Sequence, residues 1–527
     1  MPTLDWIGKK AVVKHHREVP YRLLEPVAEL SHGEPDSGNL IVQGDNLDAL
    51  KALLPRYAGK VKCIYIDPPY NTGNEGWVYN DNVNSPEIQK WLGEVVGKEG
   101  ETLDRHDRWL CMMYPRLVLL KKFLREDGVI FVSIDDNAHG FLRLLLDEIF
   151  GYDCYKSTIS VRRGVKSVQV QFDDLSKLAL GHEYIFMYSK NKNTRFPKLM
   201  LDHEIEQPGK WDTFWRGTDR PTMRYELFGF KPEKGQWRWE KNRTNKAISN
   251  YHYYMENISN DMSLDEWFVE NLTSNNTKLD FVRKNEDART QYYVPPRSGK
   301  LLSDNWMDIL LSGSETEFDT EKNIKIIERI VKWVTGSNDI ILDSFAGSGT
   351  TAHAVLSQNK IDQNNRKFVL VEMLGSVCNK ILQPRLKDAV SGYKKGKRDI
   401  EPLGSGFQFC HLSNEPIFNA EGQIRSDVTF AQLAEFVWFS ETGSGFTGNA
   451  DSPLLGMFEG RAIYLLYNGI LKDRSINGGN VLTTPVLDVL PDFDGPKVIY
   501  AAACRLGAAR MNKLGIQFKQ TPYALEI

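Results

Sequence analysis

The sequence has few cysteines and lacks any long apolar run. Its six cysteines are spread over 527 residues without a CxxC or zinc-finger spacing, and no histidine pair with acidic neighbours shows a metal-ligand pattern. A disulfide scaffold and a zinc module are therefore excluded, no metal site is predicted, and so few thiols indicate the reducing cytoplasm. No segment reaches the roughly 18 apolar residues of a membrane span. The N-terminal residues contain no apolar signal core, so we expect no membrane association.

The sequence also lacks an excess of positive charge. Lys and Arg number 66 against 69 acidic residues, which gives a net charge of −3. This balance excludes a uniformly basic surface that coats nucleic acid, but it does not exclude a local basic patch. With 41% hydrophobic and 26% charged residues the composition is that of a globular protein. The length predicts about three to four domains.

Strand-like and helical segments alternate in two parts of the chain. Expected strands lie at 40–42, 61–66, 129–134, 184–188, 339–342 and 367–371, and helical patterns at 47–54, 109–125, 142–150, 324–334 and 350–356. This alternation predicts an α/β fold with a doubly wound, parallel, Rossmann-like sheet. The rhythm is lost from about 190 to 296, where the sequence is polar and rich in Trp. We therefore expect an N-terminal arm (1–39), a core (40–190 and 300–390), an insertion (191–299), a linker (391–398) and a small C-terminal α/β unit (400–527).

The first candidate site follows the expected strand at 61–66 and reads Asp67-Pro68-Pro69-Tyr70. Ligands of open α/β sheets bind beyond the carboxyl ends of the strands. A carboxylate there only accepts hydrogen bonds, and the two prolines fix the backbone so that the Pro68 carbonyl can accept as well. Two acceptors and a flat Tyr ring suit a planar, amino-bearing ring. An ordinary strand-ending turn explains the same four residues equally well.

The second candidate site is the glycine-containing stretch from Asp343 to Thr351, between an expected strand and a helix. Gly347 and Gly349 allow a tight turn and close approach of the backbone to a ligand. No Gly-Lys-Ser/Thr follows, so this is not a phosphate-binding P-loop, and the third glycine of the dinucleotide fingerprint is missing. Glu372 ends the next expected strand, where an acidic residue can hold ribose hydroxyls or be a solvated charge.

Two further features carry candidate binding residues. Asp45, after the strand at 40–42, is either an acceptor for an exocyclic amine or a helix N-cap. Between Lys210 and Lys246 ten basic and five acidic residues alternate with aromatics, a pattern typical of phosphate contact and base stacking. From this segment we single out Arg216, Arg220 and Arg224 as candidate DNA-binding residues. Arg162, Arg163 and Lys166 form a second candidate group for phosphate contact, with a solvated charge cluster as the equal alternative.

Together, the stretches Asp67–Gly73 and Phe345–Thr351 resemble the catalytic and cofactor motifs of S-adenosylmethionine-dependent DNA amino-methyltransferases. The order, catalytic motif first with a long insertion between, is similar to the β group of these enzymes. Longer stretches within 40–190 and 300–390 resemble the modification (Mod) subunits of type III restriction-modification systems. The C-terminal unit is similar to the ends of such chains.

The resemblance implies roles for the candidate residues. Asp67 and the Pro68 carbonyl would accept from the target amine, and Tyr70 and Pro69 would line the flipped base. The cofactor residues would be Asp45 at the adenine, Glu372 at the ribose, and Asp343, Phe345, Gly347, Gly349 and Thr350 at the methionine end. The family often has a Lys-Pro pair before the helix at 324–334. Here it is Lys322-Asn323, so we assign no cofactor role to Lys322.

The implied function is methylation of adenine N6 in a base flipped out of double-stranded DNA. The implied partners are a restriction (nuclease/helicase) or other defence subunit and a second copy of the chain, with the insertion as target-recognition domain. Methylation of cytosine N4 remains open, although Asp at the start of the catalytic motif favours adenine. A catalytically idle DNA-binding subunit of a defence complex also remains open. A dehydrogenase or NTPase is disfavoured by the missing glycine and the missing Gly-Lys.

Overall fold

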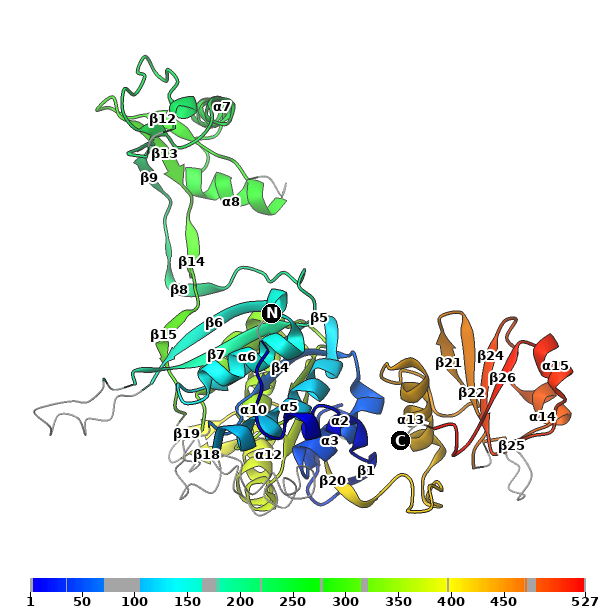
Figure 1. Ribbon diagram of the computed structural model, residues 1–527. Coiled ribbons are helices and arrows are strands. Elements are labelled where there is room, and N and C mark those ends of the chain that lie inside the picture. Colours follow the sequence, from blue (N-terminus) through cyan, green and yellow to red (C-terminus); the bar gives the residue numbers. More distant parts are fainter. Residues whose placement is uncertain are drawn as a thin grey trace, which may run out of the picture. The chain divides into compact units, whose positions relative to one another are not determined.

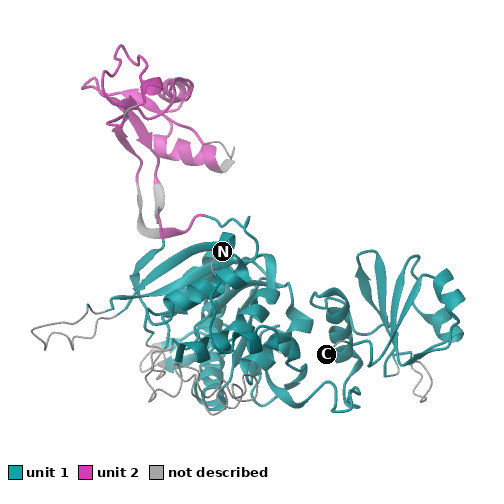
Figure 2. Cartoon of the chain, in the orientation of Figure 1, with its two compact units in different colours: residues 1–197, 304–527 teal, residues 198–303 magenta. Residues whose placement is uncertain are grey.

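The computed structural model of the protein consists of two compact units (Figure 2). Unit 1 comprises Met1–Pro197 and Asp304–Ile527, and unit 2 comprises Lys198–Ser303. The structure describes residues 3–34, 36–70, 105–163, 178, 180–218, 220–274, 278–313, 321–395, 398–468, 470–471 and 480–525. Residues 71–73 of the catalytic motif, Lys166, and residues 318–320 of the segment that leads to Lys322 lie outside these ranges.

Unit 1 is organised around one large mixed sheet with the strand order β1-β20-β3-β17-β16-β4-β5-β7-β6-β15 (Figure 1). The strands are β1 (Arg22–Pro26), β20 (Gly406–Pro416), β3 (Leu40–Gln43), β17 (Lys367–Glu372), β16 (Ile340–Asp343), β4 (Val61–Ile66), β5 (Leu124–Ile134), β7 (His182–Ser189), β6 (Tyr155–Arg162) and β15 (Asn305–Leu310). The neighbours β3, β17, β16, β4 and β5 are parallel to one another. The strands expected from the sequence are therefore confirmed.

The strand β7 departs from the expected parallel sheet. It pairs antiparallel with both β5 and β6. Because β7 follows β6 in the chain without an intervening crossover helix among the described residues, it returns along β6 and lies between β5 and β6. The apolar run Tyr184–Tyr188 indicates a buried strand, but direction depends on the connection, which apolar composition does not reveal.

Helices cover both faces of this sheet. Helix α5 contacts both α3 and α6, and these three form one group. Helix α10 contacts both α9 and α12, and these form a second group. Along β5, Ile130 and Val132 pack in the core with the first group, whereas the ring of Phe131 lies 6.3 Å from that of Trp333 on α9. Alternate side chains of a strand point to opposite faces, so the two groups lie on opposite sides. The helices are α3 (Asn46–Tyr57), α5 (Arg105–Phe123), α6 (His139–Phe150), α9 (Ile324–Val334), α10 (Thr350–Asp362) and α12 (Gln383–Ser391).

Two segments expected outside the core contribute to it. Within residues 1–39, Trp6, Val12 and Val19 are buried in the main core, and β1 pairs with β20. Strand β20, from the stretch assigned to the C-terminal unit, pairs parallel with β3. Part of the expected linker at 391–398 forms a small hairpin of β18 (Tyr393–Lys395) and β19 (Arg398–Ile400).

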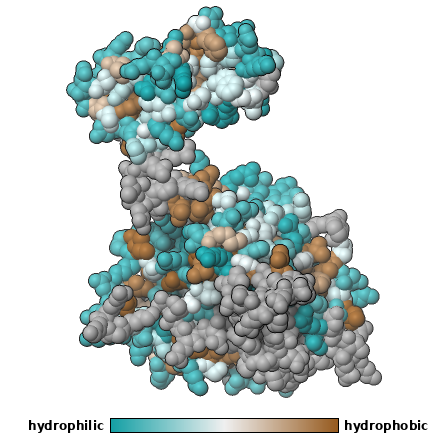
Figure 3. Space-filling model, turned by 90° about the vertical axis from the view of Figure 1, so that its left-hand side faces the viewer, coloured by the Kyte–Doolittle hydropathy of each residue, from teal (hydrophilic) through white to brown (hydrophobic). Residues whose placement is uncertain are grey.

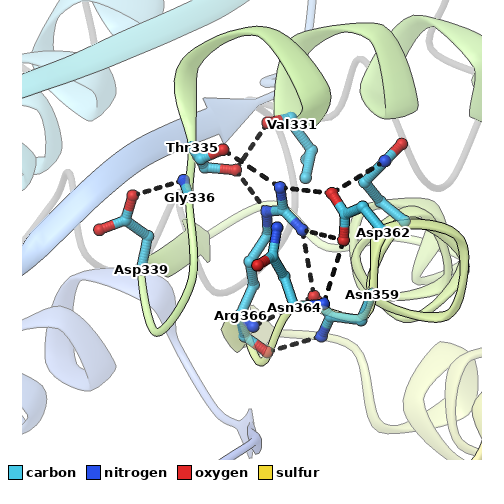
Figure 4. Close-up of polar contacts among 9 residues, drawn as sticks. Val331, Thr335, Gly336, Asp339, Asn359, Asp362, Asn364 and Arg366 are labelled. Atoms are coloured by element: carbon cyan, nitrogen blue, oxygen red, sulfur yellow. Dashed lines mark hydrogen bonds and ion pairs between the residues drawn. The ribbon is translucent and has the colours of Figure 1, made fainter. Parts of the chain in front are cut away.

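A buried arginine fixes the starts of β16 and β17 (Figure 4). Arg366 is 2% exposed and donates to both carboxylate oxygens of Asp362 at 2.8 and 2.9 Å. Its Nε donates to Thr335 Oγ1 at 2.8 Å. Thr335 follows α9 and Asp362 ends α10, so one side chain joins the ends of the two helices that precede these strands. Bidentate Arg–carboxylate pairs are among the more strongly oriented hydrogen bonds.

Unit 2 has aromatic cores of its own. Its strands are β8 (Met200–Gln207), β9 (Lys210–Thr213), β10 (Trp215–Arg216), β11 (Gln236–Trp237), β12 (Val282–Lys284), β13 (Thr290–Val294) and β14 (Arg297–Leu301), with helices α7 (Lys241–Asn257) and α8 (Leu264–Ser274). Strands β12, β13 and β9 form an antiparallel sheet. Phe214 and Trp237 lie in one core, and Phe268, Phe281 and Tyr293 in another.

The C-terminal residues form a second, smaller sheet in unit 1. Its order is β21 (Leu454–Phe458), β22 (Arg461–Leu465), β24 (Lys497–Ala501) and β26 (Ile516–Gln520). Helix α13 (Phe430–Thr442) contributes Leu433, Phe436 and Val437 to the core beside it. Across the described residues, no helix is both long and apolar enough to cross a membrane.

Candidate active site

Four of the predicted residues follow the carboxyl ends of adjacent parallel strands. Asp45 comes after β3, Glu372 ends β17, Asp343 ends β16 and Asp67 comes after β4. In the strand order these four strands are consecutive neighbours. From β4 the chain proceeds to β5 on one side, and from β16 it proceeds to β17 on the other. The boundary between β4 and β16 is therefore a topological switch point, where open α/β sheets place their ligands.

The segment after β4 is held by its own side chains and by α5. The Tyr70 hydroxyl donates to Asp67 Oδ1 at 2.7 Å, and Trp109 Nε1 donates to the Pro69 carbonyl at 2.6 Å. The Asp67 side chain is 13% exposed and Pro68 is buried. The structure thus brings together the four residues predicted for the catalytic motif and fixes their path.

Lys322 joins this cluster from the segment before α9. Its Nζ lies 3.4 Å from Asp67 Oδ1, 3.3 Å from Glu183 Oε2 and 2.5 Å from the Tyr70 hydroxyl. Glu183, buried at the start of β7, also pairs with Arg163 at 3.6 Å. From the sequence alone Lys322 has no assigned cofactor role, and Glu183 is not among the predicted site residues. A carboxylate next to the apolar run Tyr184–Tyr188 is the signal that could have drawn attention to Glu183.

These contacts shift the pKa values of the cluster. Burial raises the pKa of Asp67 above its ordinary value, while Lys322 and the hydrogen bond from Tyr70 oppose this rise. Burial also acts to lower the pKa of Lys322, but the attraction of Asp67 and Glu183 outweighs it, and the net shift is upward. The ammonium of Lys322 therefore compensates part of the cost of holding Asp67 as a carboxylate in this site.

The loop after β16 is tied to the ends of its neighbours. Asp343 accepts from the Phe345 N–H at 3.0 Å and from Thr351 Oγ1 at 2.6 Å. Gly347 and Gly349 have φ values of 50° and 80°, in the left-handed region that glycine adopts easily. The carboxylate of Glu372 accepts from the N–H groups of Gly347 and Leu374, both at 2.9 Å. Glu372 thus holds the glycine loop in place from the adjacent strand.

A buried ion pair between Arg385 and Glu321 also contacts the glycine loop. Arg385 on α12 lies 2.7 Å from Glu321 Oε1 and donates to Ser348 Oγ at 2.9 Å and Thr350 Oγ1 at 3.0 Å. Glu321 and Lys322 are consecutive, so one dipeptide contacts the Asp67 cluster and, through Arg385, the glycine loop. Asn323 then caps α9 by accepting from the Lys325 N–H.

Asp45 is the N-cap of α3. Its Oδ1 accepts from the N–H groups of Leu47 and Asp48, and its Oδ2 lies 3.1 Å from Arg116. Of the two roles that the sequence allows for Asp45, the helix N-cap is therefore present. A contact of Asp45 with the cofactor adenine stays a prediction.

The arginines predicted to contact DNA lie in different surroundings. Arg162 is exposed at the end of β6, and Arg163 is paired with Glu183. In unit 2, Arg216 and Arg220 are exposed. Arg224 is half-buried, and its Nε donates to the Gly235 carbonyl at 3.0 Å. Arg224 therefore already has a structural contact, and the DNA contacts of all five stay predictions.

Comparison with known proteins identifies the family. A family model described as DNA methylase matches residues 61–383, which contain both candidate motifs. The chain belongs to the DNA methylase family. This DNA methylase is 27% identical over 552 residues to the type III restriction-modification enzyme EcoPI Mod subunit of Escherichia phage P1, covering 92% of this chain and 79% of that protein. The resemblance to type III Mod subunits predicted from the motifs is thereby confirmed.

A second relative and a solved structure complete the comparison. The StyLTI Mod subunit of Salmonella typhimurium is 30% identical over 405 residues, covering 71% of this methylase and 59% of that protein. The structure of TTHA0409, a DNA modification methylase (so far described as putative) from Thermus thermophilus complexed with S-adenosyl-L-methionine, aligns at 12% identity with a TM-score of 0.34. The alignment covers 72% of this chain and 99% of that one.

Proposed function

We propose that this DNA methylase transfers a methyl group from S-adenosylmethionine to the N6 amine of adenine in double-stranded DNA. The observation that carries the proposal is the position of Asp67 at the end of β4, beside the glycine loop that follows the adjacent strand β16. Two ligands that must react with each other, a base amine and a methyl donor, would meet where these two strand ends are neighbours.

The acidic residues at the strand ends fit this cofactor chemically. The adenine amine, the ribose hydroxyls and the ammonium group of S-adenosylmethionine all donate hydrogen bonds, and carboxylates accept them. Glu372 would take the ribose and Asp45 the adenine. Phe345, Gly347, Gly349 and Thr350, with Asp343 nearby, would surround the methionine end. The bound cofactor supplies an electrophilic methyl group on its sulfonium.

The chain's own residues would activate the amine. An exocyclic amine is a poor nucleophile because its lone pair is delocalised into the ring. Hydrogen bonds to the Asp67 carboxylate and the Pro68 carbonyl would localise that lone pair, while Tyr70 and Pro69 would hold the plane of the base. Because the amine is inaccessible in a duplex, the base must be flipped out. Most of the acceleration would come from positioning and electrostatics.

The remaining parts of the proposal concern partners. We assign target recognition to unit 2, where basic and aromatic residues alternate. By similarity to the Mod subunits, the chain would act in a restriction-modification system with a separate restriction subunit, since neither candidate motif is a nuclease or helicase site. A homodimer would allow one copy to read the DNA while the other methylates it.

The test is the chemical identity of the product. The purified protein is incubated with plasmid DNA and labelled S-adenosylmethionine, the DNA is digested to nucleosides, and the labelled nucleoside is identified by mass. N6-methyladenine is expected. N4-methylcytosine would retain the fold and the chemistry but contradict the choice of base.

A further inference from the structure

Unit 2 contains a hollow that combines aromatic rings with positive charge. Its volume is about 660 Å³, and residues from β9, β10, the segment 227–237 and the region around β13 line it. Trp215 and Phe230 are exposed in it, at 44% and 59%. On unit 2, Figure 3 shows brown, hydrophobic areas among teal, hydrophilic side chains. Large exposed rings gathered in a concavity are typical of binding sites.

Trp215 is fixed in place by its neighbours. Its indole Nε1 donates to the Lys234 carbonyl at 3.0 Å. Gly235, with φ of 75°, lies so close that a Cβ there would come within 2.5 Å of the indole ring. The hydrogen bond and the backbone contact together hold the Trp215 ring. A ligand that stacks on the ring therefore does not pay the entropy cost of immobilising this side chain.

Phe230 is a second exposed ring, and it packs against the buried ring of Trp237. It meets Trp237 edge-on, with centroids 6.1 Å apart and an angle of 72° between the planes. Trp237 is 2% exposed, and its Nε1 donates to the Tyr225 carbonyl at 2.8 Å. The hollow therefore has two aromatic surfaces, each anchored to the framework of unit 2.

Four cations line the same hollow: Lys231, Lys234, Lys284 and Arg289. Among the described lining residues one, Glu233, is acidic, and no ion pair within the described part of the chain involves any of the four cations. Arg216 is also exposed, beside Trp215. A purely apolar ligand would leave this charge without a counterpart, and a free anion would leave the two rings exposed.

We propose that this hollow binds an unpaired nucleobase of the DNA substrate, stacked on Trp215, with the adjoining phosphates against the four cations. Stacking on aromatic side chains combined with cationic contact to the backbone is how proteins bind unpaired nucleotides. The inference rests on the proposed function, because it assigns DNA binding to unit 2. It adds that part of the strand is unpaired where unit 2 holds it.

The experiment separates bases from phosphates. The full-length protein, without S-adenosylmethionine, is titrated into a labelled single-stranded oligothymidylate and into an abasic phosphodiester strand of equal length and charge. Fluorescence anisotropy gives both dissociation constants. Wild type is expected to bind the base-bearing strand about tenfold more tightly. Trp215→Ala should abolish this preference, and Phe230→Ala should reduce it.

Two further variants act as controls. Tyr253→Ala removes a ring that is 55% exposed on α7 and does not line the hollow, so the preference should persist. Lys284→Gln with Arg289→Gln removes exposed charge without touching the rings, and should weaken binding to both strands equally. Equal wild-type affinity for the two strands, or an unchanged preference in Trp215→Ala, would overturn the inference.

Methyl transfer is measured separately. A Trp215-dependent base preference without methyl transfer by the wild type would contradict the proposed function and leave the hollow as a nucleic-acid site. Methyl transfer without a base preference would overturn the inference about the hollow and leave the proposed function intact.

Discussion

The ammonium of Lys322 lies 3.4 Å from the carboxylate of Asp67, although 255 positions separate the two residues in the chain (322 minus 67). The next residue back, Glu321, contacts Arg385, which supports the glycine loop. The segment before α9 therefore joins the two motifs, and disturbing it should affect both base activation and cofactor binding.

Replacing Lys322 by Met should move the pH dependence of methyl transfer. Lys322 opposes the rise in the pKa of Asp67, so without it that pKa rises further. Because Asp67 must be ionised to accept from the amine, the rate should begin to fall at a higher pH as the solution is acidified. The pH–rate profile measures this, and Lys322→Arg should restore part of the wild-type profile.

The matched control is Lys325→Met, which removes an exposed lysine three residues away. Its profile should match wild type. Lys322→Met should also lose about 3–5 kcal/mol of stability in a denaturant titration, because it leaves the buried carboxylate of Asp67 without its cation. A profile unchanged by Lys322→Met would refute the link to Asp67.

Replacing Arg385 by Lys should weaken cofactor binding more than it weakens folding. A lysine keeps the charge opposite Glu321, but its shorter side chain does not place a nitrogen where Arg385 Nη1 donates to both Ser348 and Thr350. We expect the dissociation constant of S-adenosylmethionine, measured by calorimetry, to rise roughly tenfold, the loss of about one charge-assisted hydrogen bond. Lys387→Met, on the exposed side of α12, should leave it unchanged.

Asp343 should make stability depend on pH. Burial raises its pKa from 3.8 to about 7, against the hydrogen bonds from Thr351 and Phe345. A folded-state pKa above the unfolded value means that the associated stability is present below about pH 3.8 and is lost as the pH rises through about 7.

Asp343→Asn should therefore flatten the pH dependence of the free energy of unfolding between about pH 4 and 7. Asp308→Asn is the control, because Arg329 lowers the pKa of Asp308 and its contribution changes below that range. The curve of unfolding free energy against pH for Asp308→Asn should run parallel to that of wild type above pH 4. If the curve for Asp343→Asn also runs parallel to wild type from pH 4 to 7, Asp343 is not held with a raised pKa.

The exposed arginines of unit 2 should contribute to the salt dependence of DNA binding. Neutralising Arg216 and Arg220 together should reduce the slope of log K against log salt by about two, one for each phosphate contact. Arg224 should contribute less, because it already donates to the Gly235 carbonyl. Lys394→Gln, an exposed lysine of unit 1, should leave the slope unchanged, and a slope equal to wild type in Arg216→Gln/Arg220→Gln would exclude this surface.

The parts of the fold predicted from sequence are those with strong local patterns. The runs at 61–66, 129–134 and 367–371 are apolar enough to indicate buried strands. Asp67 and Glu372, at the ends of the first and the last of these runs, belong to the candidate site. The neighbour relation of β4 and β16 was not predicted, because Ile341 pairs with Cys63 across a long stretch of chain and no local pattern reveals the strand order.

The parts that were missed depend on long-range pairing. Strand β20 mixes polar and apolar residues and is stabilised by β1 and β3, which are distant in sequence. The contacts of Lys322 with Asp67 and Glu183 likewise join three separate segments, and no local pattern predicts them. By contrast, the N-cap at Asp45 depends only on neighbouring residues. It was one of the two roles predicted from the sequence, and the structure shows it.

The central claim is that Asp67 activates an adenine amine for methyl transfer. The most direct test compares wild type with Asp67→Ala on the same plasmid DNA with labelled S-adenosylmethionine, identifying the labelled nucleoside by mass and measuring cofactor affinity in parallel. We predict N6-methyladenine from the wild type, and a rate reduced at least about a hundredfold in Asp67→Ala with cofactor affinity within a few fold of wild type. Normal transfer by Asp67→Ala would contradict the claim.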